Sequence, residues 1–345
     1  MIKVTRRLLT AWVVVAAATV GMILGSLAGS SDAMAAKKLK LASEAGAKGS
    51  PVANSMDLWA ELVEKNTNGE LEVDVFYQGE LGGQQELFDQ LVKGNVDMML
   101  TWPITSYDPR MGVINTPYLV LDWDDALEAY KPGGWLAEIV DPVFQDVGLK
   151  YFGPYPEGFA GVATKGRYAT AAEAAKGIKV RSQPIFPYPQ AMEALGYQAV
   201  PIDWSEVYTS IQTGVVDGDS GNVIYWDYEY FGDLIEYYVH TRHLFSTGAL
   251  LMNLKSWEGL TDQERTIVQD AAVQVVEKQF QDANAEDLKW RNAAIEAGIK
   301  FIALSDEEFH TNVKAVRDTV WPQMEEKIGT VIMEQVRANA TEPSM

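Results

Sequence analysis

One twelve-residue pattern occurs twice in this chain of 345 residues, at residues 86–97 and again at residues 206–217. Both copies read E-[LV]-[FY]-x-x-[LI]-x-x-G-x-V-D. The apolar positions before the glycine share one face of a helix, and a glycine at this point is typical of a helix end in the left-handed conformation. Each copy therefore predicts a helix that ends at Gly94 or Gly214 and leads into a buried strand. The alternative is a chance match of a common helix–strand pattern.

The segments before the two copies also match each other. Each half has a predicted strand, helix and second strand, at residues 38–43, 51–65 and 71–77 and at residues 177–181, 186–195 and 197–201. A β-α-β-α-β order favours parallel sheets flanked by helices, which is an α/β fold. Ligands of such sheets bind beyond the carboxyl ends of the strands. Two such sheets facing each other would form a hinged, two-lobed binding protein.

The last third of the chain has a different pattern. Residues 261–297 have helical periodicity and contain neither proline nor glycine. A helix of this length is longer than one domain requires, so it could pack against both lobes. A short strand is predicted at residues 299–304 and a further helix at residues 306–328.

The charge balance and the lack of cysteine exclude several kinds of function. A formal net charge of −20 argues against nucleic acid and against anionic membrane surfaces, because both attract clustered lysine and arginine. Without cysteine, disulfides, thiol nucleophiles and iron–sulfur clusters are ruled out. The three histidines, His240, His243 and His310, lack the spacing of a metal-binding motif. We therefore expect no cofactor and no metal site.

The N-terminus has the pattern of an export signal. Basic residues within residues 3–7 precede an apolar run over residues 8–27, and residues 33–35 offer a small-x-small cleavage site. This pattern predicts a signal peptide over residues 1–35. A retained transmembrane anchor is the alternative, because the apolar run is long for a signal peptide. After cleavage we expect a periplasmic protein with no segment that inserts into the membrane.

Several short motifs occur in the order and spacing of a known family. They are residues 66–69 (NTNG), 79–83 (GELGG), 177–181 (GIKVR) and 200–218, together with His243. By these motifs the whole mature chain resembles the substrate-binding subunit of a tripartite ATP-independent periplasmic (TRAP) transporter, of the DctP type. The resemblance implies a two-lobed periplasmic binding protein fold (type II-like) with a long helix spanning both lobes.

The resemblance also implies partners, a boundary between lobes and one residue role. Such a receptor would deliver a small organic acid to the permease subunits in the membrane, driven by an ion gradient rather than ATP, and Arg181 would hold the ligand carboxylate. The expected division is lobe I at residues 36–158 plus 247–286, lobe II at residues 159–246 plus 287–338, and a tail at residues 339–345.

Arg181 is also a candidate on physical grounds. It ends a predicted strand, at the sheet edge where ligands bind. Its guanidinium offers a planar fork of donors to a carboxylate, and an acidic protein needs such a local positive group to bind an anion. The alternative role is an ion pair with one of the many acidic residues.

Seven further candidates lie at predicted strand ends or in connecting loops. They are Glu44, Trp102, Tyr155, Phe186, Asp219, Asn222 and Trp226. The rings could stack on a ligand or surround a cation, and core packing is their alternative role. The family usually has an asparagine one position earlier than Asn222, so Asn222 is a substitute donor and Asp219 could accept from a hydroxyl or ammonium group. For Glu44, the alternative is that its carboxylate is solvated in a loop and does not contact a ligand.

Two other functions are alternatives to a transport receptor. A hydrolase or lyase could use two cleft carboxylates such as Glu44 and Asp219, but no nucleophile or phosphate-binding motif is present. Asp203 and Glu206 fit a helix cap. A periplasmic sensor partner that presents ligand to a membrane receptor would share the fold and site. Dicarboxylates, sugar acids, aromatic keto or amino acids and zwitterions such as ectoine are all candidate ligands, with Asp219 and the tryptophans favouring an aromatic or amino-bearing acid.

Overall fold

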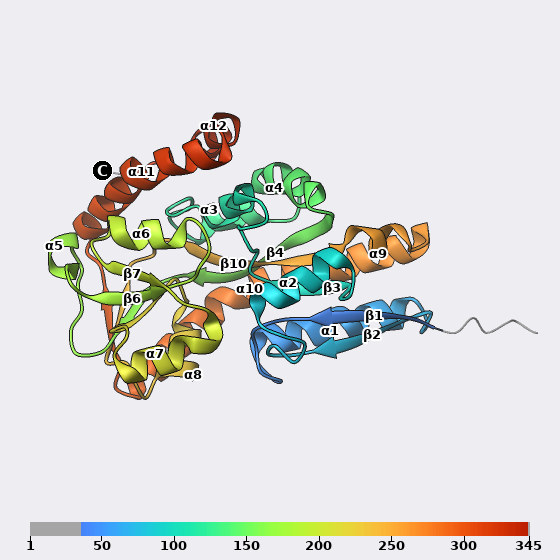
Figure 1. The fold of residues 1–345 in the computed structure, drawn as a ribbon, viewed down its shortest axis with the longest axis horizontal. Helices are drawn as coiled ribbons and strands as arrows, with labels where there is room; N and C mark the ends of the chain where they lie inside the picture. The colour runs from blue at the N-terminus through green and yellow to red at the C-terminus, as the bar shows by residue number, and fades with distance from the viewer. Residues whose placement is uncertain (1–35, 344–345) are drawn as a thin grey trace, which may run out of the picture. The chain divides into compact units, whose positions relative to one another are not determined.

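The first repeat unit folds as predicted. In the computed structural model, which describes residues 36–343, this half contains β1 (Lys37–Ala42), α1 (Pro51–Asn66), β2 (Leu71–Phe76), α2 (Gln84–Lys93) and β3 (Met98–Thr101) (Figure 1). Helix α2 ends at Gly94, which has the left-handed conformation with φ 77° and ψ 21°. The predicted signal peptide at residues 1–35 lies outside the described residues.

The second repeat unit has the same order of elements. It contains β6 (Lys179–Ser182), α6 (Tyr188–Ala194), β7 (Gln198–Pro201), the 3-10 helix η2 (Trp204–Glu206), α7 (Val207–Thr213) and β8 (Gly218–Ser220). Helix α7 ends at Gly214 with φ 79° and ψ 20°, nearly the conformation of Gly94. Asp203 caps η2 as expected, because its side chain accepts a hydrogen bond from the backbone N–H of Ser205 at 3.1 Å.

Five more strands complete two sheets. They are β4 (Leu149–Phe159), β5 (Val162–Thr164), β9 (Tyr237–His240), β10 (Phe245–Asn253) and β11 (Lys300–Ala303). The strand orders are β2-β1-β3-β10-β4 in lobe I and β11-β9-β5-β8-β6-β7 in lobe II. The strands of each repeat unit pair in parallel, whereas β10 and β5 run antiparallel to their neighbours. Both sheets are therefore mixed rather than parallel throughout.

The antiparallel strands follow from how the chain passes between the sheets. It leaves lobe I through β4, enters lobe II at β5 after residues 160–161, and returns from β9 to β10 through residues 241–244. Strands β4 and β9 therefore run toward the boundary between the sheets, whereas β5 and β10 run away from it, which makes β10 antiparallel to β4 and β5 antiparallel to β9. The exact boundary between the lobes stays a prediction.

The long helix spans both lobes, as predicted. Helix α10 (Asp262–Glu296) begins with a capping box in which Thr261 and Glu264 bond to each other's backbone N–H groups. It packs against α1 and β4 of lobe I and against α8 (Ile224–Phe231) and β11 of lobe II. The indole N–H of Trp59, a buried residue of α1, donates to the carbonyl of Val268 in α10 at 3.4 Å.

The remaining helices lie around the two sheets, some of them outside other helices (Figure 1). They are η1 (Pro109–Asn115), α3 (Trp123–Tyr130), α4 (Trp135–Asp146), α5 (Ala172–Ala175), α9 (Leu254–Glu258), α11 (Asp306–Ile328) and α12 (Thr330–Asn339). Helix α11 matches its predicted bounds, whereas α12 was not predicted. Beyond α12, the hydroxyl of Thr341 donates to Asp125 at 2.5 Å.

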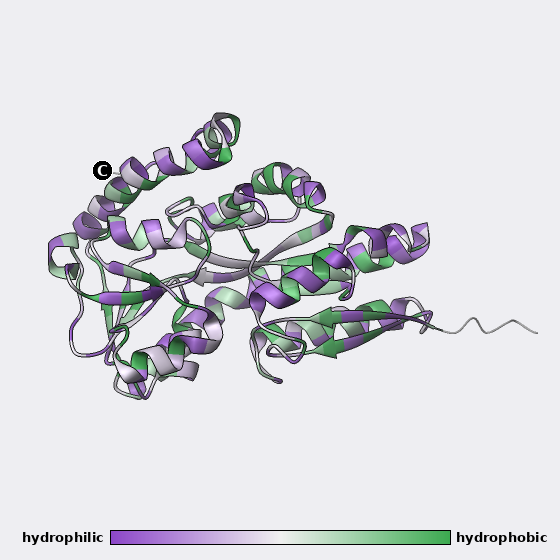
Figure 2. Ribbon diagram, in the orientation of Figure 1, coloured by the Kyte–Doolittle hydropathy of each residue, from purple (hydrophilic) through white to green (hydrophobic). Residues whose placement is uncertain are grey.

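The core lies on the sheets. Every residue of β10 is buried, and hydrophobic residues gather on the strands in Figure 2, whereas α11 carries hydrophilic and hydrophobic residues side by side. Within residues 36–343, none of the helices combines the length and the apolar composition required to cross a bilayer.

The repeated glycine provides a test of the helix stops. An alanine at position 214 would meet no heavy atom within 4 Å of its Cβ, so the left-handed backbone alone opposes it. We expect Gly214→Ala to lower the free energy of unfolding by about 1 kcal/mol, measured by urea denaturation.

Gly214→Asn is the matched control, because asparagine tolerates the left-handed region better than alanine, and it should lose less stability. Wild-type stability in the alanine variant would contradict this account of the repeat.

Candidate functional site

A cavity lies where strand ends from both lobes meet. Its empty volume is about 380 Å³, and its lining residues are Glu44, Ala45, Gln84, Trp102, Glu157, Arg181, Gln183, Trp204, Asn222 and Trp226. Trp102 directly follows β3 of lobe I, and Gln183 directly follows β6 of lobe II. The position agrees with the rule that ligands of open α/β sheets bind beyond the carboxyl ends of the strands.

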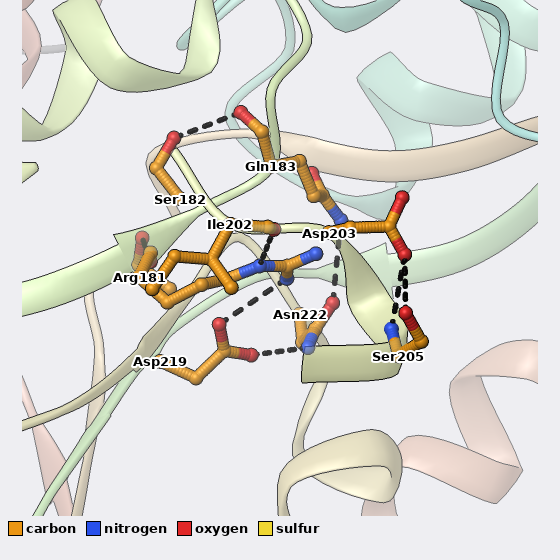
Figure 3. A network of polar contacts seen from close by, with 9 residues as sticks. Arg181, Ser182, Gln183, Ile202, Asp203, Ser205, Asp219 and Asn222 are labelled. Carbon is orange, nitrogen blue, oxygen red and sulfur yellow. Dashed lines mark hydrogen bonds and ion pairs between the residues drawn. The ribbon is translucent and has the colours of Figure 1, made fainter. Parts of the chain in front are cut away.

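Arg181 lines this cavity from β6. Its side chain is only 2% exposed, its Nε donates to the carbonyl of Ile202 at 2.9 Å, and its Nη1 lies 3.2 Å from Oδ1 of Asp219. The ion pair weighed in the sequence analysis is therefore present. Figure 3 shows the other terminal nitrogen pointing away from Asp219, and within residues 36–343 no hydrogen bond from it is found. That nitrogen remains able to donate to a ligand.

Asp219 lies behind Arg181 because of strand register. Strands β6 and β8 are parallel neighbours, and Arg181 pairs directly with Asp219, so their side chains project from the same face. Asp219 is fully buried, and its second oxygen accepts from the side-chain amide of Asn222 (Figure 3). Burial raises the pKa of Asp219, while the positive charge of Arg181 opposes that rise. Asp219 thus supports Arg181 rather than lining the cavity.

A second buried acid, Asp227, lies on α8. Both of its carboxyl oxygens are buried, and neither accepts a hydrogen bond from a residue in the described part of the chain. Burial raises the pKa of Asp227 well above its usual range, and the negative charge of Asp219 adds to the rise. A neutral Asp227 can donate its proton to Asp219, which would help Asp219 to stay ionised beside Arg181.

Glu44 lines the cavity from the loop after β1. Its Oε1 accepts from the hydroxyl of Thr101 at 3.0 Å and from the backbone N–H of Trp102 at 3.3 Å. Its Oε2 is buried and has no partner among residues 36–343. Burial raises the pKa of Glu44 to about 7. One acceptor atom of this carboxyl group is therefore left for a ligand.

Glu157 lines the same cavity from β4. Its Oε1 accepts from the indole N–H of Trp226 at 2.6 Å, and its Oε2 accepts from the hydroxyl of Ser246 at 2.7 Å. Burial raises its pKa to about 7 as well. Glu157 therefore adds a second acidic group while it orients Trp226.

Three tryptophans form the apolar wall. The rings of Trp102 and Trp226 meet edge to face with centroids 6.1 Å apart, and those of Trp204 and Trp226 do so at 5.5 Å. The guanidinium carbon of Arg181 lies 5.8 Å from the centre of the Trp204 ring. The cavity thus combines indole surfaces, acidic groups and one guanidinium.

Besides Asp219, two more of the predicted residues lie outside this cavity. Tyr155 lines a second cavity of about 370 Å³ empty volume, which shares Glu157 and Trp226 with the first. Phe186 lies between the lobes, where its backbone N–H donates to the hydroxyl of Thr105 at 3.0 Å. Contact of the eight predicted residues with a ligand stays a prediction.

Five lining residues were not among the predicted ones: Ala45, Gln84, Glu157, Gln183 and Trp204. Glu157 could have been found, because it is the one charged residue in an apolar stretch between Lys150 and Lys165. Gln183 and Trp204 closely follow strands β6 and β7, so the strand-end rule also points to them.

The histidines are structural. His243 is buried, and its Nδ1 lies 2.6 Å from the hydroxyl of Thr241. Burial lowers the pKa of His240 and of His243 to about 3, so both rings are neutral near pH 7. Among residues 36–343, no group of three or more histidine, cysteine, aspartate or glutamate side chains is placed to hold a metal ion.

The raised pKa of Asp227 has a consequence for stability. Because the folded protein holds this proton and the unfolded chain releases it near pH 4, the free energy of unfolding should fall as pH rises above about 4, until the folded-state pKa is passed. Asp227→Asn keeps the shape without a proton to lose, so we expect a shallower fall and higher stability than wild type at pH 8. Each unit of pKa difference corresponds to about 1.4 kcal/mol.

Urea unfolding between pH 4 and pH 8 measures this difference. Asp270→Asn, at an exposed position of α10, removes the same charge and should keep the wild-type slope. Equal slopes in wild type and Asp227→Asn would show that Asp227 is not held neutral.

The sequence is similar to known proteins. The profile of family 7 of the bacterial extracellular solute-binding proteins (DctP) matches residues 41–327. The ectoine-binding periplasmic protein TeaA of Halomonas elongata is 28% identical over 279 residues, which cover 78% of each chain.

Solved structures have the same fold. A TRAP periplasmic solute-binding protein from Desulfovibrio salexigens with bound orotic acid superposes with a TM-score of 0.81 at 19% identity, over 88% of this chain and 97% of the other. One from Roseobacter denitrificans with bound β-D-glucuronate gives a TM-score of 0.81 at 22% identity, over 88% and 99%. At these identities the likeness establishes the fold alone.

Proposed function

The chain belongs to the DctP family of periplasmic solute-binding proteins, and we propose that it holds a small organic carboxylate on Arg181 for delivery to the membrane permease of a TRAP transporter. Members of this family are solute-binding proteins and not enzymes. The proposal therefore concerns which solute is bound, by which residues, and for which partner.

The free donor of Arg181 carries the proposal. Arg181 is the one lysine or arginine among the residues that line the cavity. Two of its guanidinium nitrogens are held by Ile202 and Asp219, which fixes the plane of the group and leaves the third nitrogen available. A carboxylate that meets a preorganised guanidinium gains charge-assisted hydrogen bonds with little loss of side-chain freedom.

The contacts between the lobes support a closed, ligand-holding conformation. Phe186 of lobe II bonds to Thr105 of lobe I, and the backbone N–H of Ala47 in lobe I lies 3.5 Å from the hydroxyl of Tyr230 in lobe II. These contacts join segments of the two lobes that hinge opening would separate. A ligand that bridges the lobes would favour closure by its differential affinity for the closed form, and a permease could then recognise that form.

The relatives support the ligand class. Orotic acid, β-D-glucuronate and succinate, the ligands of three similar solved structures, are all carboxylic acids. The geometry also argues against the hydrolase alternative, because Asp219 is bonded to Arg181 and Asn222 instead of facing Glu44 across the cavity. A sensor partner would use the same site, and binding of the closed protein to purified permease or sensor domains distinguishes the two.

Substitution of Arg181 tests the proposal. We expect Arg181→Ala to weaken carboxylate binding by roughly 2–5 kcal/mol, about 30-fold or more, because the ligand charge would be buried without a partner. Isothermal titration with ligands found in a thermal-shift screen of organic acids, neutral sugars and organic cations measures the loss.

Arg167→Ala is the control, because it removes an exposed arginine of lobe II whose Nη2 donates only to the backbone of Lys176. Arg181→Lys keeps a positive charge opposite Asp219, so we expect this variant to fold. Its affinity then shows whether Arg181→Ala loses binding because the guanidinium is missing or because the protein is unfolded. Unchanged affinity in a folded Arg181→Ala protein would refute the role of Arg181, and a screen in which only neutral sugars or cations bind would refute the ligand class.

A further inference from the structure

Among the described residues, the buried polar atoms of the cavity lining that lack a hydrogen-bond partner are both acceptors. Oε2 of Glu44 and Oε1 of Gln183 are buried, and neither has a hydrogen-bond partner within residues 36–343. Both residues line the cavity, and their side chains are 8% and 9% exposed. Buried acceptors without partners are costly, so a well-matched ligand brings N–H or O–H donors to them. A plain dicarboxylate offers acceptors only.

The charges of the cavity point to the same kind of ligand. Its one cationic side chain, Arg181, is already paired with Asp219, whereas Glu44 and Glu157 have no cationic partner among the described residues. A ligand carboxylate added beside Arg181 would therefore increase an existing excess of acidic groups. A positive charge on the ligand would offset that excess, because like charges in a desolvated site repel strongly.

The indole surfaces complete the argument. Trp102 adjoins Glu44 directly, since its backbone N–H donates to that carboxyl group, and Trp226 adjoins Glu157 through its indole N–H. An organic cation that is less hydrated than ammonium is attracted to indole faces and to carboxylates alike. The tryptophan walls thus lie beside the acidic groups, which is the arrangement that a cationic nitrogen within an apolar ligand requires.

From these observations we infer that the solute is a zwitterion, with its carboxylate on Arg181 and its cationic N–H group toward Glu44 and the tryptophan walls. This inference rests on the proposed carboxylate function and narrows it. Because the pKa of Glu44 is about 7, its carboxyl group ionises readily when a ligand cation binds beside it.

Matched ligand pairs test the inference on the mature protein. Each zwitterion is compared with a carboxylate of similar shape that lacks the charged nitrogen: ectoine with cyclohexanecarboxylate, and L-proline with cyclopentanecarboxylate. These pairs are placed within the broader thermal-shift screen of organic acids, and every hit is measured by isothermal titration. We expect the hits to carry a cationic nitrogen and to bind at least 10-fold tighter than their nitrogen-free counterparts.

Glu44→Gln tests the position of the cation. The substitution keeps the shape and removes the charge, so we expect at least 10-fold weaker binding of the zwitterionic hit and no such loss for a carboxylate without nitrogen. Glu277→Gln, at an exposed position of α10, is the matched control and should leave both affinities unchanged. Circular dichroism and thermal melting confirm that both variants are folded.

The outcomes separate this inference from the function on which it rests. Carboxylate hits without a cationic nitrogen that bind as tightly as zwitterions, or full zwitterion affinity in folded Glu44→Gln, would overturn the inference and leave the carboxylate receptor intact. A screen without any carboxylate hit would overturn the proposed function itself.

Discussion

The buried ion pair between Arg181 and Asp219 is the interaction on which the cavity depends. An arginine that is 2% exposed needs compensation for its lost hydration, and the register of β6 with β8 supplies it from the neighbouring strand. Asp227 extends the network behind Asp219, and burial together with the charge of Asp219 raises its pKa well above the usual range. In a chain with a formal net charge of −20, this network holds one guanidinium at the sheet edge with a donor still free.

The cavity exists only because two sheets meet at their strand ends. The chain passes between the lobes through two short links, and α10 packs against elements of both. Glu44 and Trp102 come from lobe I, whereas Arg181, Gln183 and Trp204 come from lobe II. Since each lobe supplies only part of the lining, separation of the lobes would open the cavity.

Whether a lining residue could be predicted from the sequence depends on which element places it at the cavity. Arg181, Trp102 and Asn222 follow or end strands of the repeat units, so the strand-end rule located them. Glu157 lies within β4, a strand outside both repeats, so the strand-end rule does not point to it. Phe186 and Tyr155 lie outside this cavity, because Phe186 makes a contact between the lobes and Tyr155 of β4 lines a second cavity.

The sequence by itself determined the local elements: the two repeat units, the glycine helix stops and the bounds of α10 and α11 follow from periodicity and capping, which act over a few residues. The tertiary structure decided the antiparallel strands, the pairing of Arg181 with Asp219 and the gathering of Glu44, Glu157 and three tryptophans around one cavity. These features depend on which distant strands become neighbours, and no local pattern encodes that choice. Burial then alters the chemistry of the residues brought together, which is why the acidity of Glu44, Glu157 and Asp227 could be described only once the fold was known.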